Sequence, residues 1–265
     1  MSAQGRAADA RGDRCRAAQR IVREAGDVAR AAFADRDRLS VRAKGTQDWV
    51  SNVDLEVETL IRRRLAEAFP GEPVLGEEDG DGGTPAGAST WIVDPIDGTT
   101  CFLLGIPQWC VVLGLVEDAR PVVAAIYDPM ADHMYTAVAG GGAFLNDAPI
   151  RASAAKDVGA GLISIGASVK ADPETSVRFM AELVTDGGMY LRIGACALGL
   201  CYVASGRLLG MWEPLVSPWD DLAGLLIVGE AGGRTSAYPN RIVTDRRHPV
   251  LAAAPGIWTR LSGLL

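Results

Sequence analysis

The sequence lacks the features that mark several specialised classes of protein. Its five cysteines are an odd number without the density or spacing of a disulfide framework or a zinc site, which favours buried thiols in a reducing compartment. No run approaches the roughly 18 apolar residues of a membrane span, and the start MSAQGRAADARGDR has no apolar segment of the secretory kind. We therefore expect a cytoplasmic protein with no membrane partner.

Positive charge is also in short supply. The 26 lysines and arginines are outnumbered by 33 aspartates and glutamates, which gives a net charge of −7 and argues against a broad nucleic-acid-binding surface. Aromatic residues make up only 6%, but hydrophobic residues reach 48% of 265 residues, enough to bury a full core as one large domain or two coupled halves. An acidic globular protein that binds an anionic substrate would need cations to do so.

Apolar periodicity predicts a first half in which two helices lie on a sheet. The first helix covers about 12–36, and the second follows Ser51 or Asn52 as its N-cap and ends before Pro70. Short apolar runs bounded by turn residues predict the sheet. Its strands are expected at 73–78, 90–95, 109–117 and 121–129, with a hairpin around 133–146.

The second half alternates strands and helices. Strands are expected near 161–166, 188–192 and 207–212, helices near 173–186, 195–205 and 219–231, and a closing strand and helix follow. We therefore predict a flexible lead-in at 1–11, an α+β lobe at 12–150 and an α/β lobe at 151–265. A site between two such lobes is the default expectation.

The stretch TWIVDPIDGTT holds the strongest chemical signal. Asp94 ends an apolar run, and Pro95 and Ile96 let the chain turn so that Asp97 can face the same point. Two carboxylates about 4 Å apart repel by roughly 4 kcal/mol at an effective dielectric of ~20, a cost that a bound cation removes. Oxygen ligands alone, including the Ile96 carbonyl, favour Mg²⁺ before Mn²⁺ or Ca²⁺. The alternative is an aspartate-rich turn whose side chains cap local N–H groups.

Other carboxylates stand at equivalent places, where strands end or helices begin. Each alone can equally be a first-turn carboxylate that favours the helix dipole, or a solvated acid. Together they are what a metal centre at the mouth of a sheet requires. They are Asp54, Glu77, Glu78, Asp220 and Asp221.

The residues after Asp97 predict an anion site beside the metals. Gly98 allows close approach of backbone N–H groups, and a helix starting there would point its positive end at a phosphate. The Thr99 hydroxyl can orient a water. We expect metal-assisted hydrolysis of a phosphate monoester, in which one ion lowers the pKa of the attacking water and another stabilises the leaving oxygen.

Three motifs in this order resemble the signatures of a known family. GEED at 76–79, WIVDPIDGTT at 91–100 and WDDLAG at 219–224 are similar to those of the inositol monophosphatase family of Mg²⁺-dependent, lithium-sensitive phosphatases. The resemblance extends more weakly from about Ala17 to the C-terminus. It implies a layered αβαβα sandwich and a homodimer.

The resemblance also implies roles for individual residues. Glu77, Asp94 and the Ile96 carbonyl would hold the first metal, Asp94, Asp97 and Asp220 the second, and Glu77 with waters a weaker third. Asp54, Thr99 and Glu77 would flank and activate the nucleophilic water, while Gly98 and Thr99 would donate N–H groups to the phosphate. Glu78 and Asp221 would be neighbours of the ligands or exposed.

The substrate pocket is less well defined. Glu213 stands where inositol-cleaving members carry a glutamate that contacts ring hydroxyls, and Gly194 and Ala195 match the segment that also touches the ring. The chain departs from the family at Ala195, where threonine is common, and at Cys101 and Leu104, where asparagine and histidine are customary. Glu213 can alternatively be an exposed loop carboxylate.

Several functions therefore stay open at this stage. The first is hydrolysis of inositol 1-phosphate or a related cyclitol or sugar phosphate, and the second is hydrolysis of histidinol phosphate, fructose 1,6-bisphosphate or a 3′-phosphoadenosine nucleotide. A third is a role as a binding partner with a vestigial metal site, since some family members act in transcription complexes. The presence of Asp54, Glu77, Asp94, Asp97 and Asp220 weighs against this last reading.

Overall fold

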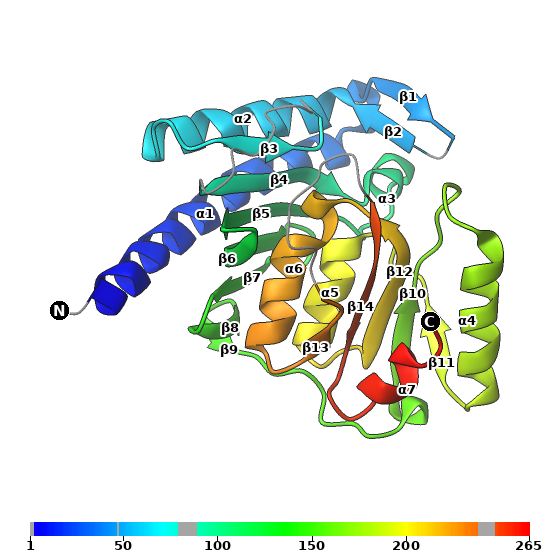
Figure 1. Ribbon diagram of the computed structural model, residues 1–265. Helices are drawn as coiled ribbons and strands as arrows, with labels where there is room; N and C mark the ends of the chain where they lie inside the picture. The colour runs from blue at the N-terminus through cyan, green and yellow to red at the C-terminus, as the bar shows by residue number, and fades with distance from the viewer. Residues whose placement is uncertain (1–2, 47, 79–88, 238–246) are drawn as a thin grey trace.

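The computed structural model describes residues 3–46, 48–78, 89–237 and 247–265, and it has five layers of alternating helices and sheets (Figure 1). The predicted αβαβα sandwich is therefore confirmed. The layers alternate because each sheet has two apolar faces, and each face is covered by helices.

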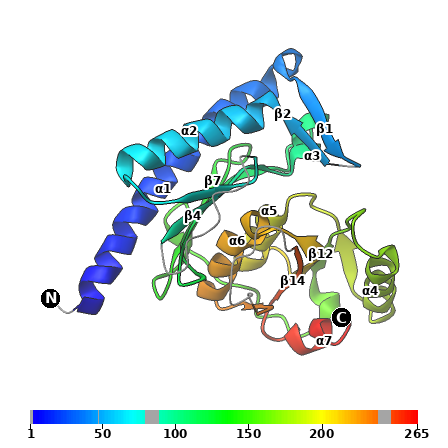
Figure 2. The ribbon, with the colours of Figure 1, turned by 45° about the horizontal axis from the view of Figure 1, so that its top comes forward.

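The first two layers belong to the front half of the chain. Helices α1 (Ala3–Ala34) and α2 (Asn52–Ala68) lie together over one face of a seven-stranded sheet (Figure 2). Its strands follow the chain in order, and only the first pair is parallel. They are β3 (Val74–Gly76), β4 (Thr90–Asp97), β5 (Cys110–Glu117), β6 (Arg120–Asp128), β7 (His133–Val138), β8 (Gly142–Leu145) and β9 (Ala148–Pro149).

The middle layer consists of α5 (Cys196–Ala204) and α6 (Pro218–Glu230), which separate the two sheets. Both helices are buried on nearly all sides, so their apolar residues contact strands above and below and form one core. The second sheet has the order β11-β10-β12-β14-β13. Its strands are β10 (Leu162–Ile165), β11 (Met189–Leu191), β12 (Gly210–Val216), β13 (Arg234–Thr235) and β14 (His248–Ala253).

The last layer covers the outer face of the second sheet. Helix α4 (Pro173–Thr185) and the short α7 (Trp258–Ser262) pack there, and Phe179 of α4 stacks on Trp212 of β12 with ring centroids 4.8 Å apart. Each predicted strand and helix of the second half is present within a few residues of its expected bounds. Among the described residues, no helix combines the length and apolar character that crossing a membrane requires.

Three differences from the expected elements concern the front half. Helix α1 begins at Ala3, so residues 3–11 are helical rather than an irregular lead-in, and Arg11 pairs with Glu117 at 2.5 Å. A hairpin of β1 (Val41–Gly45) and β2 (Asp48–Ser51) was not expected, because both strands are short and every residue of β1 is exposed. Strand β4 extends to Asp97. The division at 12–150 and 151–265 stays a prediction.

Short helical segments complete the chain. The turn that follows β4 opens helix α3 (Thr99–Leu104), as the sequence suggested, with Gly98 as its N-cap. Two 3₁₀ turns, η1 (Arg36–Arg38) and η2 (Val158–Ala160), lie in connections.

Candidate functional site

A cavity of about 180 Å³ lies where β4, α3 and the start of α5 meet β12 and α6. Its wall holds the predicted site residues with two exceptions, Asp54 and Ala195. The residues brought together are Glu77, Asp94, Ile96, Asp97, Gly98, Thr99, Gly194, Glu213 and Asp220. We call this space the inner cavity.

Proline explains why Asp94 and Asp97 reach the same space. Side chains three residues apart in a regular strand point to opposite faces of the sheet. Pro95 has no N–H for the ladder, and the pairing of β4 with β5 shifts register between Asp94 and Asp97. The extra residue turns both carboxylates toward the inner cavity.

Asp97 also joins the two halves of the chain. Its Oδ1 accepts a hydrogen bond from Cys196 N–H at 2.9 Å, and its Oδ2 accepts one from Ala197 N–H at 2.8 Å. These are the first N–H groups of α5, which have no partner within the helix. The Cys110 thiol donates to Oδ2 at 3.4 Å. Asp97 is therefore both a wall of the cavity and the cap of a helix in the middle layer.

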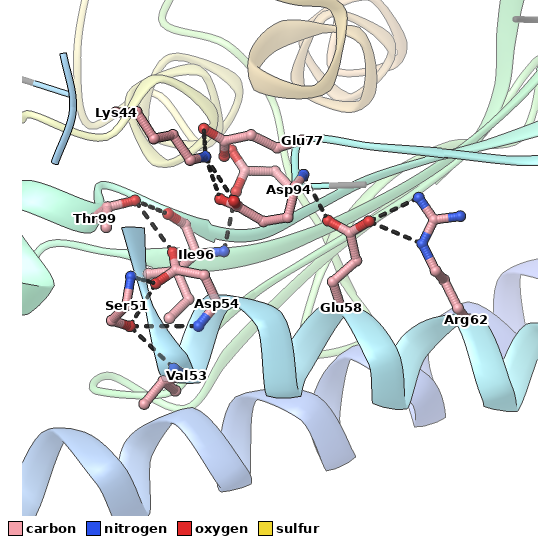
Figure 3. Close-up of polar contacts among 11 residues, drawn as sticks. Lys44, Ser51, Val53, Asp54, Glu58, Arg62, Glu77, Asp94, Ile96 and Thr99 are labelled. Carbon is pink, nitrogen blue, oxygen red and sulfur yellow. Dashed lines mark hydrogen bonds and ion pairs between the residues drawn. The ribbon is translucent and has the colours of Figure 1, made fainter. Parts of the chain in front are cut away.

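Asp54 lies behind the cavity wall, next to Thr99, which is part of that wall (Figure 3). Asp54 is fully buried at the first turn of α2, where its Oδ2 accepts hydrogen bonds from Ser51 N–H at 2.8 Å and from the Ser51 hydroxyl at 2.5 Å. The Thr99 hydroxyl lies 3.0 Å from the Ile96 carbonyl oxygen and 3.4 Å from Asp54 Oδ1. Both neighbours accept, so the Thr99 oxygen keeps its lone pairs for another donor.

Lys44 enters the site from the β1–β2 hairpin. Its ammonium lies 2.6 Å from Glu78 Oε2 and 3.8 Å from Glu77 Oε1, as Figure 3 shows for Lys44 and Glu77. The Glu78 side chain is only 3% exposed. Glu78 therefore lies beside Glu77 with a largely buried side chain that is paired with Lys44, and its role next to a metal ligand stays a prediction. Asp79 of the GEED motif lies outside the described residues.

Asp220 reaches the cavity from the start of α6. A capping box with Ser217 holds it there, and Asp220 Oδ2 accepts from Ser217 N–H at 2.7 Å. The next residue, Asp221, points elsewhere: its Oδ2 lies 2.8 Å from His248 Nε2 of β14, and the side chain is fully buried. Asp221 thus ties α6 to β14.

The electrostatics of the inner cavity are those of crowded anions. Burial raises the pKa of Glu77 well above its usual range, and the charge of Asp220 raises it further. Burial together with the charges of Glu77 and Asp97 does the same to the pKa of Asp94. Burial raises the pKa of Asp220 to about 7, against the opposing hydrogen bond from Ser217 N–H. A positive charge in the cavity would relieve all of these groups.

The donors fit a hard cation, although they do not enclose one as they stand. Among the described residues, no three Asp, Glu, His or Cys side chains are grouped tightly enough to hold an ion. Asp94 Oδ1 instead accepts from Ile96 N–H at 3.0 Å, and Asp97 is turned to α5. Carboxylates and one carbonyl are oxygen donors, which suit Mg²⁺ better than Zn²⁺.

Gly98 forms the tight turn next to these carboxylates. Its φ of +94° belongs to the left-handed region, and a Cβ there would lie 2.7 Å from the Gln108 carbonyl oxygen and 3.0 Å from Ala195 Cβ. Only glycine fits. Ala195 is buried behind Gly98 and does not line the cavity, so its predicted contact with substrate stays a prediction.

Glu213 lies on the cavity wall, not in an exposed loop. It belongs to β12, and no described residue forms a hydrogen bond or ion pair with its carboxyl group. Burial raises its pKa to about 8, against the charge of Arg192, so the carboxyl is largely neutral at pH 7. Gly166 makes room for it, because a Cβ on Gly166 would lie 1.5 Å from Glu213 Oε2.

A larger cavity of about 650 Å³ adjoins the inner one and shares Glu77, Arg192 and Asp220 with it. We call it the outer cavity. Lys44, Arg192 and Arg247 are three basic residues of the site that sequence reasoning missed. A motif search for carboxylates has no means of finding them, and the one available signal is that Arg192 directly precedes the Ile193-Gly194 segment.

Comparison with known proteins agrees with this geometry. Residues 13–261 match the model of the inositol monophosphatase family. The chain is 39% identical to inositol-1-monophosphatase of Rhizobium meliloti over 80% of each chain, and 36% identical to Nus factor SuhB of Pasteurella multocida over 90% of each. The crystal structure of the SuhB protein from Bartonella henselae superposes with a TM-score of 0.85 at 32% identity, covering 94% of this chain and 96% of that one.

The match spans nearly the whole chain, and it includes both sheets and every motif that lines the inner cavity. The signatures that suggested a family from sequence alone therefore reflect a shared fold and not a chance run of aspartates. The chain belongs to the inositol monophosphatase family, a family of phosphoric monoester hydrolases.

Proposed function

We propose that this protein hydrolyses phosphate monoesters with Mg²⁺ as its cofactor, and that its substrate is inositol 1-phosphate or a related cyclitol or sugar phosphate. One observation carries the proposal: carboxylates from β4, α6 and the end of β3 line a single cavity beside the Gly98–Thr99 turn. Family membership implies a divalent metal in general. The number of ions, two or three, and replacement by Mn²⁺ are part of the proposal.

Five groups would hold the cations. Glu77, Asp94 and the Ile96 carbonyl would hold one, and Asp94, Asp97 and Asp220 another, while Glu77 with waters would hold a weaker third. All five residues already line the cavity, so rotations of the carboxylate side chains would bring the ligand oxygens to the cations. When bound, the cations would supply positive charge that stabilises the phosphoryl group as negative charge develops on it. Lithium inhibition is expected from family resemblance.

The remaining groups would orient the reactants. The N–H groups of Gly98 and Thr99 would bind the phosphate oxygens at the start of α3. The Thr99 hydroxyl, whose proton is directed to Ile96 or Asp54, would accept a hydrogen bond from the attacking water. Glu77 would then take the proton of that water. Glu213 would form hydrogen bonds with hydroxyl groups of the substrate.

A screen of phosphate release in Mg²⁺ tests the substrate. It would compare inositol 1-phosphate with histidinol phosphate, fructose 1,6-bisphosphate and 3′-phosphoadenosine 5′-phosphate. A clear preference for histidinol phosphate or the nucleotide would overturn the first choice. We also expect a cytoplasmic homodimer that binds no nucleic acid, and sedimentation of the purified protein checks the association state.

The variant Asp94→Asn tests the metal assignment. Loss of a carboxylate charge proposed to be shared by two cations should lower kcat by at least about a hundredfold at 5 mM Mg²⁺, without loss of the folded state. Circular dichroism and urea unfolding verify the fold. Retention of wild-type kcat would remove Asp94 from the site.

A second candidate function is a role as a protein-binding partner. It is favoured only by relatives named Nus factor SuhB. The intact set of carboxylates in the inner cavity favours catalysis. If no ester released phosphate in Mg²⁺ while a protein partner bound at micromolar affinity, the second function would replace the first.

A further inference from the structure

The outer cavity has no role in the hydrolysis described above. Its volume of about 650 Å³ lies within the roughly 300–1,000 Å³ typical of small-molecule sites. Because it shares wall residues with the inner cavity, a ligand whose phosphate sits beside Gly98 can extend into it. The leaving group of the ester would therefore occupy the outer cavity.

The charge of this cavity is the reverse of the chain as a whole. Among the described residues, its acidic wall residues are Glu77 and Asp220, which stand on the boundary with the inner cavity. The basic wall residues are Arg192, which also lines the inner cavity, and Arg247 and Lys170, which line the outer cavity alone. Three basic side chains around one space in a protein of net charge −7 point to an anionic ligand.

Two of these basic groups are available to a ligand. Neither Arg192 nor Arg247 forms a hydrogen bond or an ion pair with any residue that the structure describes, and both are exposed. A guanidinium presents planar donors that match a phosphate or a carboxylate. Arg192 lines both cavities, whereas Arg247 lines only the outer one.

Ordered segments adjoin both arginines. Arg247 precedes His248, whose ring nitrogen lies 2.8 Å from the buried Asp221 carboxylate. Arg192 lies between β11 and Gly194, whose φ of +87° fixes a turn. Their positions at the cavity therefore depend on ordered elements.

The remaining wall is partly apolar. Trp219 contributes an aromatic side chain, and Val177 and Met180 of α4 face the same space. Val177 is 59% exposed, so its side chain is accessible to a ligand in the outer cavity. An apolar surface beside basic groups suits a carbon skeleton that bears an anion.

We propose that the outer cavity binds a second anionic group, a phosphate or a carboxylate, carried by the leaving group of the substrate. Arg247 and Arg192 bind that group, and Trp219 covers the carbon skeleton. This inference rests on the proposed function, since it places the ester phosphate in the inner cavity. Within the proposed class of cyclitol and sugar phosphates, it predicts a preference for esters that carry a second anionic group.

Matched pairs of esters test the proposal. Fructose 1,6-bisphosphate against fructose 1-phosphate tests a second phosphate, and 2-phosphoglycerate against glycerol 2-phosphate tests a carboxylate. In Mg²⁺ we expect kcat/KM to be at least tenfold higher for the doubly anionic member of one pair. Arg247→Gln should reduce that ratio about tenfold, the effect of losing one charge-assisted hydrogen bond. The control Arg178→Gln, on α4 but outside both cavities, makes the same charge change and should leave the ratio unaltered.

Three outcomes would overturn the inference: equal kcat/KM within both pairs, a ratio that Arg247→Gln does not change, or an equal drop in Arg178→Gln. Calorimetric binding of the same esters to metal-free protein separates this inference from the proposed function. If no ester is hydrolysed but the doubly anionic one still binds more tightly through Arg247, the phosphatase proposal fails and the second-anion site stands. If hydrolysis occurs without any preference that depends on Arg247, the phosphatase proposal stands and the second-anion site fails.

Discussion

Replacing Glu213 by glutamine should change how the stability of the protein depends on pH. The carboxyl has an ordinary pKa of 4.5, which burial raises to about 8 in the folded protein. The folded state therefore binds this proton more tightly than the unfolded state does. The contribution of Glu213 to stability is largest below pH 4.5, falls as the pH rises, and stops changing above about pH 8.

The size of the effect follows from the same shift. Between pH 4.5 and pH 8, each pH unit lowers the contribution of Glu213 to the free energy of unfolding by at most about 1.4 kcal/mol. The largest possible loss from pH 5 to pH 8 is therefore ~4 kcal/mol. The carboxyl lines a cavity that water can enter, which screens its charge, so we expect about half of that value, roughly 2 kcal/mol. Glutamine has the same shape and no charge. The free energy of unfolding of Glu213→Gln, relative to that of the wild type, should therefore rise by about 2 kcal/mol between pH 5 and pH 8.

Urea unfolding at pH 5, 6, 7 and 8 measures this difference. The experiments need EDTA, because bound Mg²⁺ would lower the pKa of nearby carboxyl groups. The titrating groups that do not interact with Glu213 are common to both proteins and cancel in the comparison. Glu56→Gln, an exposed position on α2, is the matched control and should run parallel to the wild type. A parallel curve for Glu213→Gln, or a loss of stability that grows with pH, would mean that Glu213 is ionised and paired, and would refute the reasoning.

Three further substitutions test the packing that supports the site. Gly166→Ala should displace Glu213, because its Cβ would lie 1.5 Å from the carboxyl oxygen. It should lower kcat/KM on the preferred ester about tenfold without changing the dependence on Mg²⁺. In the control Gly229→Ala the new Cβ meets no atom within 4 Å, so kcat/KM should not change. Asp97→Asn should lower the free energy of unfolding in EDTA by about 1–3 kcal/mol. The amide has one oxygen, and its NH₂ group cannot accept the second of the two hydrogen bonds from the N–H groups of α5. Equal stability would show that the cap is unimportant. Ser51→Ala removes the cap of α2 and should cost about 1 kcal/mol in urea unfolding, with no change in the slope of the transition.

Local chemistry was readable where a short segment determines its own structure. The sequence predicted that Ser51 or Asn52 caps α2, and the cap is Ser51, which forms a capping box with Asp54 within one turn of helix. A turn at Gly98 was predicted because glycine allows close approach of the backbone, and its positive φ and close packing agree with that choice. The bulge in β4 follows from the missing N–H of Pro95. Such features need no knowledge of the rest of the chain.

Positions that depend on distant segments were not readable in this way. Strand β1 is short and exposed, so nothing in its own sequence placed Lys44 beside Glu77 and Glu78. Asp54 and Ala195 were expected at the cavity itself, but packing of α2 and α5 places them behind its wall. Residue type suggested their roles, and only packing decided their distance from the cavity.

By itself, the sequence determined most helices and strands through apolar periodicity and the set of carboxylates through short motifs, and the resemblance of those motifs to a known family implied the layered architecture. Tertiary structure decided that Arg192 and Arg247, 55 positions apart in the numbering, line one space beside those carboxylates. The physical reason is that a cavity is bounded by whichever side chains remain after the core has packed. Which residues remain depends on the contacts between the middle helices and both sheets, and no local pattern records those contacts.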